Sequence, residues 1–148
     1  MRIEHGKVSE KWEEVESLLV QHWLELAKNK HLMHLSPDVE RYQLMESSGN
    51  VIALFAYEKE DLIGYSVSFI ASHLHYSDLV YAQNDVLFVS REHRKGRTGL
   101  ALIQETEAAA KRAGCQMIIW HAKQGTALDR LMPRLGYGVQ DIMYSREL

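Results

Sequence analysis

The chain has 148 residues, of which 46% are hydrophobic and 25% are charged, and its formal net charge is −3 at pH 7. This length and this balance are those of a globular protein, so we expect one domain over residues 1–148. The acidic net charge argues against a protein whose main partner is DNA or RNA, because nucleic-acid-binding domains usually carry a basic surplus.

The compartment is indicated by what the chain lacks. No apolar run is long enough to cross a bilayer, and no apolar segment follows a basic cluster at the start, so we expect neither a membrane span nor a secretory signal. The only cysteine, Cys115, cannot form an internal disulfide, which favours a reducing compartment. We therefore expect a cytoplasmic protein.

The first fifty residues predict a short strand and two helices. Residues 1–8 alternate weakly between polar and apolar, as a strand does. Over residues 9–27 the apolar side chains recur at helical spacing, and Ser9 is placed to cap this helix. The segment 36–38 reads Ser-Pro-Asp, which provides an N-cap, a proline at the first helical position and an acid, and it predicts a second helix that ends at Gly49.

The spacing of apolar residues then changes from helical to alternating. Residues 51–58 and 63–69 predict two strands, and the charged residues 59–61 between them predict a turn. Residues 79–90 predict a third strand. Successive strands joined by hairpins are antiparallel.

The segment 84–114 is the most informative of the chain. A hydrophobic strand runs into a loop rich in Arg, Lys and Gly, and an amphipathic helix follows that ends at Gly114. Such a loop directs backbone N–H groups and the positive end of a helix dipole to one point, which suits a phosphate or a pyrophosphate. The alternative is a solvated basic loop that only caps an ordinary helix.

The last thirty residues complete the expected fold. Residues 116–120 form a short apolar run typical of a strand buried on both faces, residues 128–135 predict a short helix, and residues 141–148 predict a last strand. The expected order of elements is (β)ααβββαβαβ. This order predicts a mixed α/β (α+β) fold, in which helices flank a mixed, mostly antiparallel central sheet.

Two short motifs add a resemblance to a known family. In the first, Val89 ends a strand, Arg94 opens the loop and Gly99 lies at the start of the helix. In the second, the sequence Leu-Gly-Tyr at 135–137 closes a short helix. Together with the order of elements, these motifs resemble the GNAT superfamily of acyl-CoA N-acyltransferases.

The resemblance implies an N-acetyltransferase that moves an acetyl (acyl) group from acetyl-CoA to a primary amine, by direct attack in a ternary complex and without a metal. In the family, main-chain groups of the central strand contact the pantetheine arm of the coenzyme, and the loop binds its pyrophosphate. The residues that the resemblance places in coenzyme binding are Leu87, Phe88, Val89, Arg94, Lys95, Gly96, Arg97, Thr98 and Gly99. The acceptor amine stays open, and family members often form homodimers through their C-terminal strands.

Asp85 is the candidate general base by the same resemblance, because several members carry an acidic residue near the acceptor amine on this strand. Alternation would place Asp85 on one strand face with Tyr81, Leu87 and Val89. A carboxylate with a raised pKa, or one that acts through a water molecule, accepts the proton of an ammonium group. The alternative is that Asp85 only pairs with a neighbouring His or Arg.

The remaining candidates are histidines and tyrosines. His73 and His75 lie before the expected hairpin and Tyr81 after it; we expect the two histidines to serve as base or acceptor contacts and Tyr81 as an acceptor contact. His34 lies between the first two helices, a region that closes over the acceptor in the family that the chain resembles, so the resemblance implies an acceptor contact there. Tyr137, Tyr81 or a water molecule would protonate the thiolate that leaves. The eight histidines have no ligand set with Cys or acidic partners at metal-binding spacing, so we expect no metal site.

Two positions depart from the family pattern and keep a second interpretation open. Arg97 stands where the family has the first glycine of the loop motif, with Gly96 one residue early. Met132 stands where many members have the tyrosine that protonates the thiolate. The alternative is therefore a catalytically degenerate GNAT-like coenzyme-binding or regulatory module. A nucleic-acid modifier that docks through residues 91–97 is a weaker alternative, because the net charge opposes it.

Overall fold

The computed structural model describes residues 1–148 and contains five strands and four α-helices. The strands are β1 (Arg2–Gly6), β2 (Val51–Glu58), β3 (Asp61–Ser72), β4 (Val80–Val89) and β5 (Met117–Trp120). The helices are α1 (Trp12–Leu26), α2 (Val39–Ser47), α3 (Thr98–Arg112) and α4 (Ala127–Leu131), with short 3-10 helices η1 (Arg91–His93) and η2 (Met132–Leu135). No helix combines the length and the apolar character that spanning a membrane requires.

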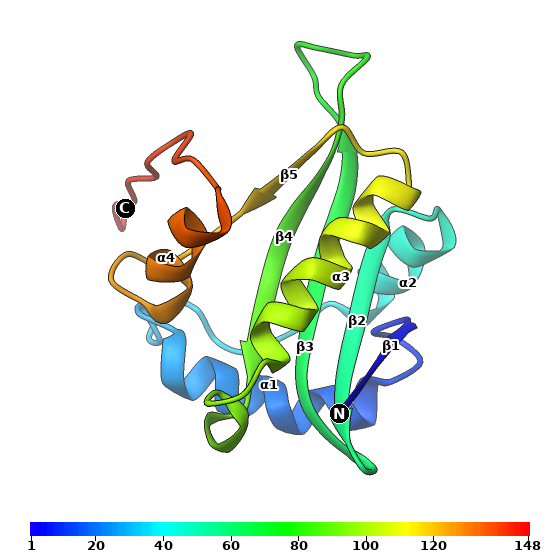
Figure 1. Ribbon diagram of the computed structural model, residues 1–148. Coiled ribbons are helices and arrows are strands. Elements are labelled where there is room, and N and C mark those ends of the chain that lie inside the picture. The colour runs from blue at the N-terminus through cyan, green and yellow to red at the C-terminus, as the bar shows by residue number, and fades with distance from the viewer.

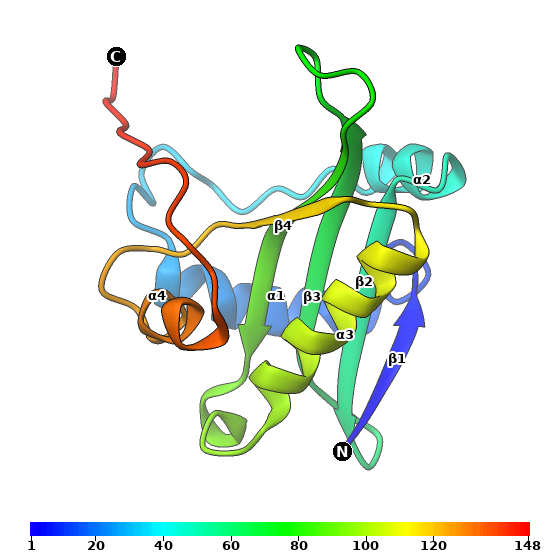
Figure 2. The same ribbon diagram turned by 45° about the horizontal axis from the view of Figure 1, so that its top comes forward.

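The five strands form one sheet in the order β1-β2-β3-β4-β5. Neighbouring strands are antiparallel from β1 to β4, whereas β5 runs parallel to β4. Helix α3 crosses one face of the sheet and α1 crosses the opposite face (Figure 1), and Figure 2 shows the same two layers from a second direction. The mixed, mostly antiparallel sheet between helices confirms the expected fold class.

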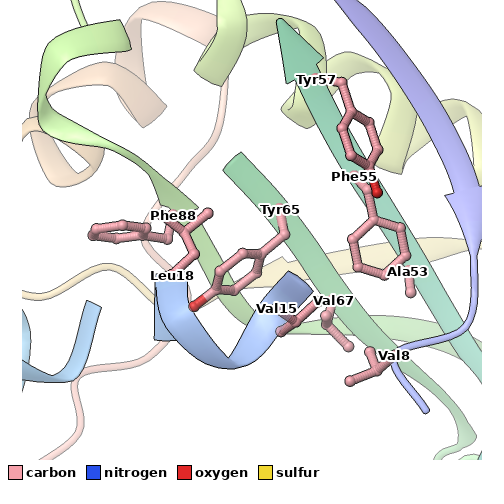
Figure 3. Packing of buried hydrophobic residues seen from close by; sticks show 9 residues of the cluster. All are labelled: Val8, Val15, Leu18, Ala53, Phe55, Tyr57, Tyr65, Val67 and Phe88. Atoms are coloured by element: carbon pink, nitrogen blue, oxygen red, sulfur yellow. The ribbon is translucent and has the colours of Figure 1, made fainter. Parts of the chain in front are cut away.

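Strand β2 is buried on both faces because a helix covers each side of the sheet. Phe55 packs in a cluster with Val15 and Leu18 of α1 (Figure 3). Its neighbour Leu54 packs in a second cluster with Leu102 of α3. These two clusters, named here the α1 cluster and the α3 cluster, form the core and hold the sheet between the helices.

The first two helices begin later than the sequence predicts. Helix α1 starts three residues after Ser9, because the Ser9 hydroxyl donates to the Glu46 carboxylate instead of capping the helix. Helix α2 has Asp38 as its N-cap, and the Asp38 carboxylate accepts a hydrogen bond of 2.9 Å from the backbone N–H of Arg41. The start of α2 is thus set by a capping hydrogen bond, whereas α1 begins after Lys11 without a side-chain cap.

The strand expected at residues 141–148 is absent, so the observed order ends with α4 and the short helix η2. Residues 136–148 form neither helix nor strand, and the side chains of Val139 and Ile142 are 81% and 71% exposed. A strand needs a partner for its backbone N–H and C=O groups. The outer edge of β5 has no such partner within this chain.

Candidate active site

Strands β4 and β5 pair over only part of their length. The parallel pairing ends at Asn84, which lies opposite Trp120. Beyond this point β4 continues to Val89, while the chain after Trp120 leaves the sheet, so the two strands diverge (Figure 1). On the β5 side, the backbone groups of residues 85–89 have no ladder partner, and they can therefore bind an extended ligand.

A β-bulge lies where the two strands diverge. In the register with β3, Asn84 is opposite Ser68 and Val86 is opposite Val67, which leaves Asp85 as an extra residue of β4. A bulge of this kind bends the strand and redirects its side chains. The sequence gives no sign of it, since neither glycine nor proline is present at this point.

Because of the bulge, the side chains of β4 do not alternate between the two faces as the sequence predicts. An unbroken period of two would place Asp85 on the same face as Leu87 and Val89. In the structure Leu87 and Val89 pack against the α3 cluster, whereas Val86 and Phe88 pack against the α1 cluster. The extra residue removes Asp85 from the regular alternation and leaves it at the point of divergence.

The Asp85 carboxylate makes no hydrogen bond and no ion pair, and part of it reaches solvent. The protein around it nevertheless removes water from its other side, which raises the pKa of Asp85, while the charge of His121 acts in the opposite direction. Burial raises the pKa of Tyr42 to about 12, and the charge of Asp85 adds to this shift. Asp85 therefore lies between α2 and the end of β5. It forms no ion pair with a neighbouring His or Arg, which was the alternative to a role as base.

A half-buried histidine extends this region on the α1 side of the sheet. His22 stacks on Phe88 with ring centroids 4.7 Å apart, and its Nδ1 lies 2.7 Å from the hydroxyl oxygen of Tyr65. Burial chiefly lowers the pKa of His22 to about 4, and the charges of Lys123 and Arg94 lower it further. His22 was not among the expected residues, although it continues the apolar stripe of α1.

Arg94 fastens the loop between β4 and α3. Its Nε donates to the carbonyl oxygen of Val89 at 2.8 Å, and its guanidinium group forms two hydrogen bonds with the Glu25 carboxylate. The same group lies 5.1 Å from the ring centroid of Phe88. These contacts use three of the five guanidinium hydrogens, so the Arg94 side chain is held mainly by the protein and the backbone of Arg94 is the simpler donor to an anion.

The rest of the loop is open to solvent. Lys95, Gly96 and Arg97 are exposed, and no side chain caps the start of α3, whose first turn has no acidic residue. The first N–H groups of α3 and its helix dipole are therefore available to an anion. Arg97 has a φ of −95°, which any residue adopts, so this loop shape does not require the family's glycine there.

Tyr137 lies beside the end of β5. Its hydroxyl accepts a hydrogen bond of 2.9 Å from the indole N–H of Trp120 and donates to the Glu107 carboxylate. Burial and the hydrogen bond to Glu107 raise the pKa of Tyr137 above its ordinary value. Met132, which occupies the position of the family tyrosine, is buried.

The expected acceptor residues fall in two separate places. His73 and Tyr81 have ring centroids 6.0 Å apart, and His75 lies 5.9 Å from His73, on the hairpin between β3 and β4. This hairpin projects from the sheet at the end opposite to the loop at 94–99 (Figures 1 and 2). His34 lies in the segment between α1 and α2. No three side chains of His, Cys, Asp or Glu are grouped so that they could hold a metal ion.

Comparisons with known proteins identify similar sequences and folds. The sequence profile described as "Acetyltransferase (GNAT) family" matches residues 12–137. No curated protein sequence matches the chain.

Three solved structures illustrate the shared fold. A ribosomal-protein-alanine N-acetyltransferase from Brucella melitensis biovar Abortus 2308 has a TM-score of 0.76 at 17% identity, over 99% of this chain and 98% of its own. An aminoglycoside acetyltransferase, HMB0005, from an uncultured soil metagenomic sample has a TM-score of 0.79 at 16% identity, over 99% and 97%. A tetramutant of the BH1408 protein from Bacillus halodurans has a TM-score of 0.80 at 16% identity, over 100% of both chains.

Proposed function

The chain belongs to the GNAT acetyltransferase family, and on that premise we propose that it transfers an acetyl group from acetyl-CoA to a primary amine. The observation that carries this proposal is the divergence of β4 and β5 next to the uncapped start of α3. A strand edge without a partner and a free helix N-terminus suit a ligand with an amide-rich arm and a pyrophosphate.

The coenzyme would be held mainly by the backbone. The pantetheine arm would run along the edge of Leu87, Phe88 and Val89, where the Val89 carbonyl oxygen is already bonded to Arg94. The pyrophosphate would lie on the backbone N–H groups of the loop from 94 to 99, with the exposed side chains of Lys95 and Arg97 adding positive charge. In this arrangement the thioester would reach the point of divergence, where Asp85 lies.

The reaction would proceed by direct attack of the amine on the thioester. Asp85 would accept the proton of the ammonium group, directly or through a water molecule, and the free amine would attack the carbonyl carbon. A C–N bond forms, the C–S bond breaks and the thiolate of coenzyme A leaves. A free backbone N–H of β4 would stabilise the negative charge that develops on the carbonyl oxygen.

The thiolate then needs a proton, and we propose Tyr137 as its source. The raised pKa keeps the Tyr137 hydroxyl protonated at working pH, and its one hydrogen, which the Glu107 carboxylate accepts in the structure, would turn from Glu107 to the thiolate. Solvent water is the alternative, because the pKa of a thiol is not far above neutrality.

The acceptor would approach from the α1 and α2 side of the sheet. The charge of Asp85 adds to the rise that burial causes in the pKa of Tyr42 and Tyr65, so its negative charge would attract an ammonium group on the side where these aromatic rings lie. We propose His34 as an acceptor contact from the segment between the helices, and His73, His75 and Tyr81 as contacts from the hairpin.

Thermal unfolding with and without acetyl-CoA tests the proposal, since a ligand that binds the native state raises the melting temperature. We expect a rise that grows with acetyl-CoA concentration and is absent with ATP. Amines are then screened for the release of coenzyme A thiol. A rise without turnover for any amine would favour the coenzyme-binding or regulatory module, for which Met132 is the main argument. No rise at millimolar acetyl-CoA would contradict the proposed transferase and would favour a regulatory module whose altered loop no longer binds the coenzyme.

A further inference from the structure

A buried polar network lies behind the β-bulge, on the α3 side of the sheet. Its members are Asn84 of β4, Ser66 and Ser68 of β3 and Thr106 of α3, and none of them is more than 1% exposed. The residues around them belong to the apolar α3 cluster. Polar groups buried in such surroundings are costly unless each one is hydrogen-bonded, so the network requires an explanation.

The Asn84 carboxamide bridges the bulge. Its Nδ2 lies 3.0 Å from the carbonyl oxygen of Val67 and 3.2 Å from that of Val86, which are the two residues paired directly after the extra residue. It also lies 3.2 Å from the hydroxyl oxygens of both Ser66 and Ser68. An amide nitrogen has two hydrogens, so at most two of these four oxygens are bonded at once. The two carbonyl groups are pure acceptors, which requires the nitrogen and not the oxygen of the carboxamide to face them.

The network continues into α3. The Ser66 and Thr106 hydroxyl oxygens are 2.9 Å apart, and Thr106 donates to the carbonyl oxygen of Leu102 at 2.7 Å. Since the Thr106 hydrogen is used in this way, Ser66 donates to Thr106. A run of neighbouring polar groups therefore leads from the bulge in β4 to the helix that starts at the proposed phosphate loop.

These hydrogen bonds fix the backbone geometry at the bulge. Apolar side chains of the same size would fill this part of the α3 cluster without polar atoms to satisfy. An apolar residue at 84, however, would leave the carbonyl groups of Val67 and Val86 without the donor that spans the extra residue. The ladder between β3 and β4 could then shift, and the Asp85 side chain would turn with it.

We propose that Asn84 is a positioning residue for acetyl transfer: its carboxamide holds the bulge that keeps Asp85 and the free edge of residues 85–89 at the divergence of β4 and β5. This inference rests on the proposed function. Asn84 itself is buried behind the strand and would act only through the backbone that it holds.

The test compares Asn84→Leu with Thr106→Val. Both variants remove one polar group from the same network and keep the side chain close to its original size, but only the first removes the donor that spans the bulge. Because misplacement of a reacting group by about 1 Å costs on the order of a hundredfold in rate, we expect Asn84→Leu to lower kcat by about tenfold to a hundredfold. The KM for acetyl-CoA should change by less than about threefold, and Thr106→Val should keep kcat within about threefold of the wild type.

A second measurement does not depend on activity. Amide hydrogen exchange of a peptide that covers residues 84–89 should be faster in Asn84→Leu than in Thr106→Val, because the backbone of the bulge is released. If Asn84→Leu does not fold, Asn84→Ala is measured in the same way, since it removes the donor without adding bulk.

The outcomes separate the two proposals. If the wild type releases no thiol with any amine, the proposed function fails, and hydrogen exchange alone decides whether Asn84 holds the bulge. If the wild type is active and Asn84→Leu keeps both its kcat and its exchange rate at the level of Thr106→Val, the positioning role is overturned.

Discussion

The Asp85 carboxylate combines two properties that a base for an ammonium group needs. It is open to solvent on one side, so an amine or a water molecule can reach it, and it is partly desolvated on the other, which raises its pKa. Both properties come from its place as the extra residue of the bulge, where it belongs to neither regular face of β4. In a regular strand, Asp85 would lie on one of the two faces of the sheet, among the side chains that pack there.

Replacement of Asp85 by Asn is the direct test of the base. We expect kcat/KM to fall by about 10²- to 10⁴-fold, the range that general base catalysis supplies, while acetyl-CoA still raises the melting temperature. In the wild type, kcat/KM should rise as the pH passes upward through the raised pKa of Asp85, because only the ionised carboxylate accepts a proton. Thiol release followed from pH 4 to pH 8 measures both effects.

The matched control for this change is Asp78→Asn, which removes an exposed carboxylate on the hairpin between β3 and β4. It should leave kcat/KM within about twofold, as surface substitutions usually do. An Asp85→Asn protein with full activity and an unchanged pH profile would remove Asp85 from the mechanism.

The proton source for the thiolate is tested at Tyr137. If its hydroxyl supplies this proton, Tyr137→Phe should lower kcat by about tenfold or more. The same change frees the Trp120 indole N–H and the Glu107 carboxylate from their shared partner, so the melting temperature is measured in parallel. A kcat within about threefold of the wild type in a folded variant would assign the proton to water instead.

At the scale of the elements, α1 does more than cover the sheet. Its C-terminal half carries His22, which stacks on β4, and Glu25, which holds Arg94 of the proposed phosphate loop. Lys123, from the loop after β5, donates to the carbonyl oxygen of Leu26 at the end of the same helix. Helix α1 thus contacts both β4 with its following loop and the loop after β5, and it fixes the distance between these two segments.

The packing of α1 predicts a dependence of stability on pH. The pKa of His22 falls from 6.5 to about 4 on folding, so between these values the unfolded chain binds a proton that the native state excludes. Stability is therefore lost as the pH falls from 6.5 towards 4, by at most about 3 kcal/mol for this group. Urea unfolding at several pH values measures the slope, and His22→Phe, which keeps a ring against Phe88, should reduce it.

The control for this slope is His34→Gln, which removes an exposed histidine from the segment after α1. It should leave the pH dependence of stability as in the wild type. Equal slopes in the wild type and in His22→Phe would mean that His22 is protonated in the native state, which would contradict its burial.

The sequence predicts elements that local patterns define and misses features that need a distant partner. The amphipathic α3 and the loop before it follow from spacing and composition within one segment. The bulge at Asp85 depends on the register with β3 and on the buried Asn84, and no local residue type marks it. His22 could have been found, because it lies on the apolar stripe of α1. The strand expected at residues 141–148 does not form. Like the bulge, it depends on a distant partner, and nothing in its own sequence shows whether a partner edge exists.

At the scale of the whole molecule, the sheet separates two environments. The α3 side carries the polar network and leads to the loop at 94–99, and the other side carries the aromatic residues of the α1 cluster, with Tyr42 of α2 packed against them. Beyond Asn84 the sheet is no longer continuous between β4 and β5, because the two strands diverge there (Figure 1). A donor bound along the free edge and an acceptor bound beside Tyr42 would meet at this point, which is the geometry that transfer in a ternary complex requires.

The C-terminal segment provides the last prediction. Its apolar side chains Val139 and Ile142 are exposed, and its contact with the rest of the chain includes an exposed ion pair of 3.0 Å between Glu147 and His31. Such a pair contributes about 1 kcal/mol at most, so deletion of residues 139–148 should lower the melting temperature by less than about 4 °C. The rise caused by acetyl-CoA should persist, because the proposed coenzyme contacts lie elsewhere.

The same deletion tests the homodimer that we propose for this segment, in which its apolar residues would pair with the free edge of β5 in a second copy. Dimerisation makes the melting temperature rise with protein concentration, and deletion of the pairing segment should remove that dependence. The melting temperature is therefore measured for both proteins over a hundredfold range of concentration. A full-length chain that melts at the same temperature throughout, and elutes as a monomer, would show that the edge of β5 is free in solution as well.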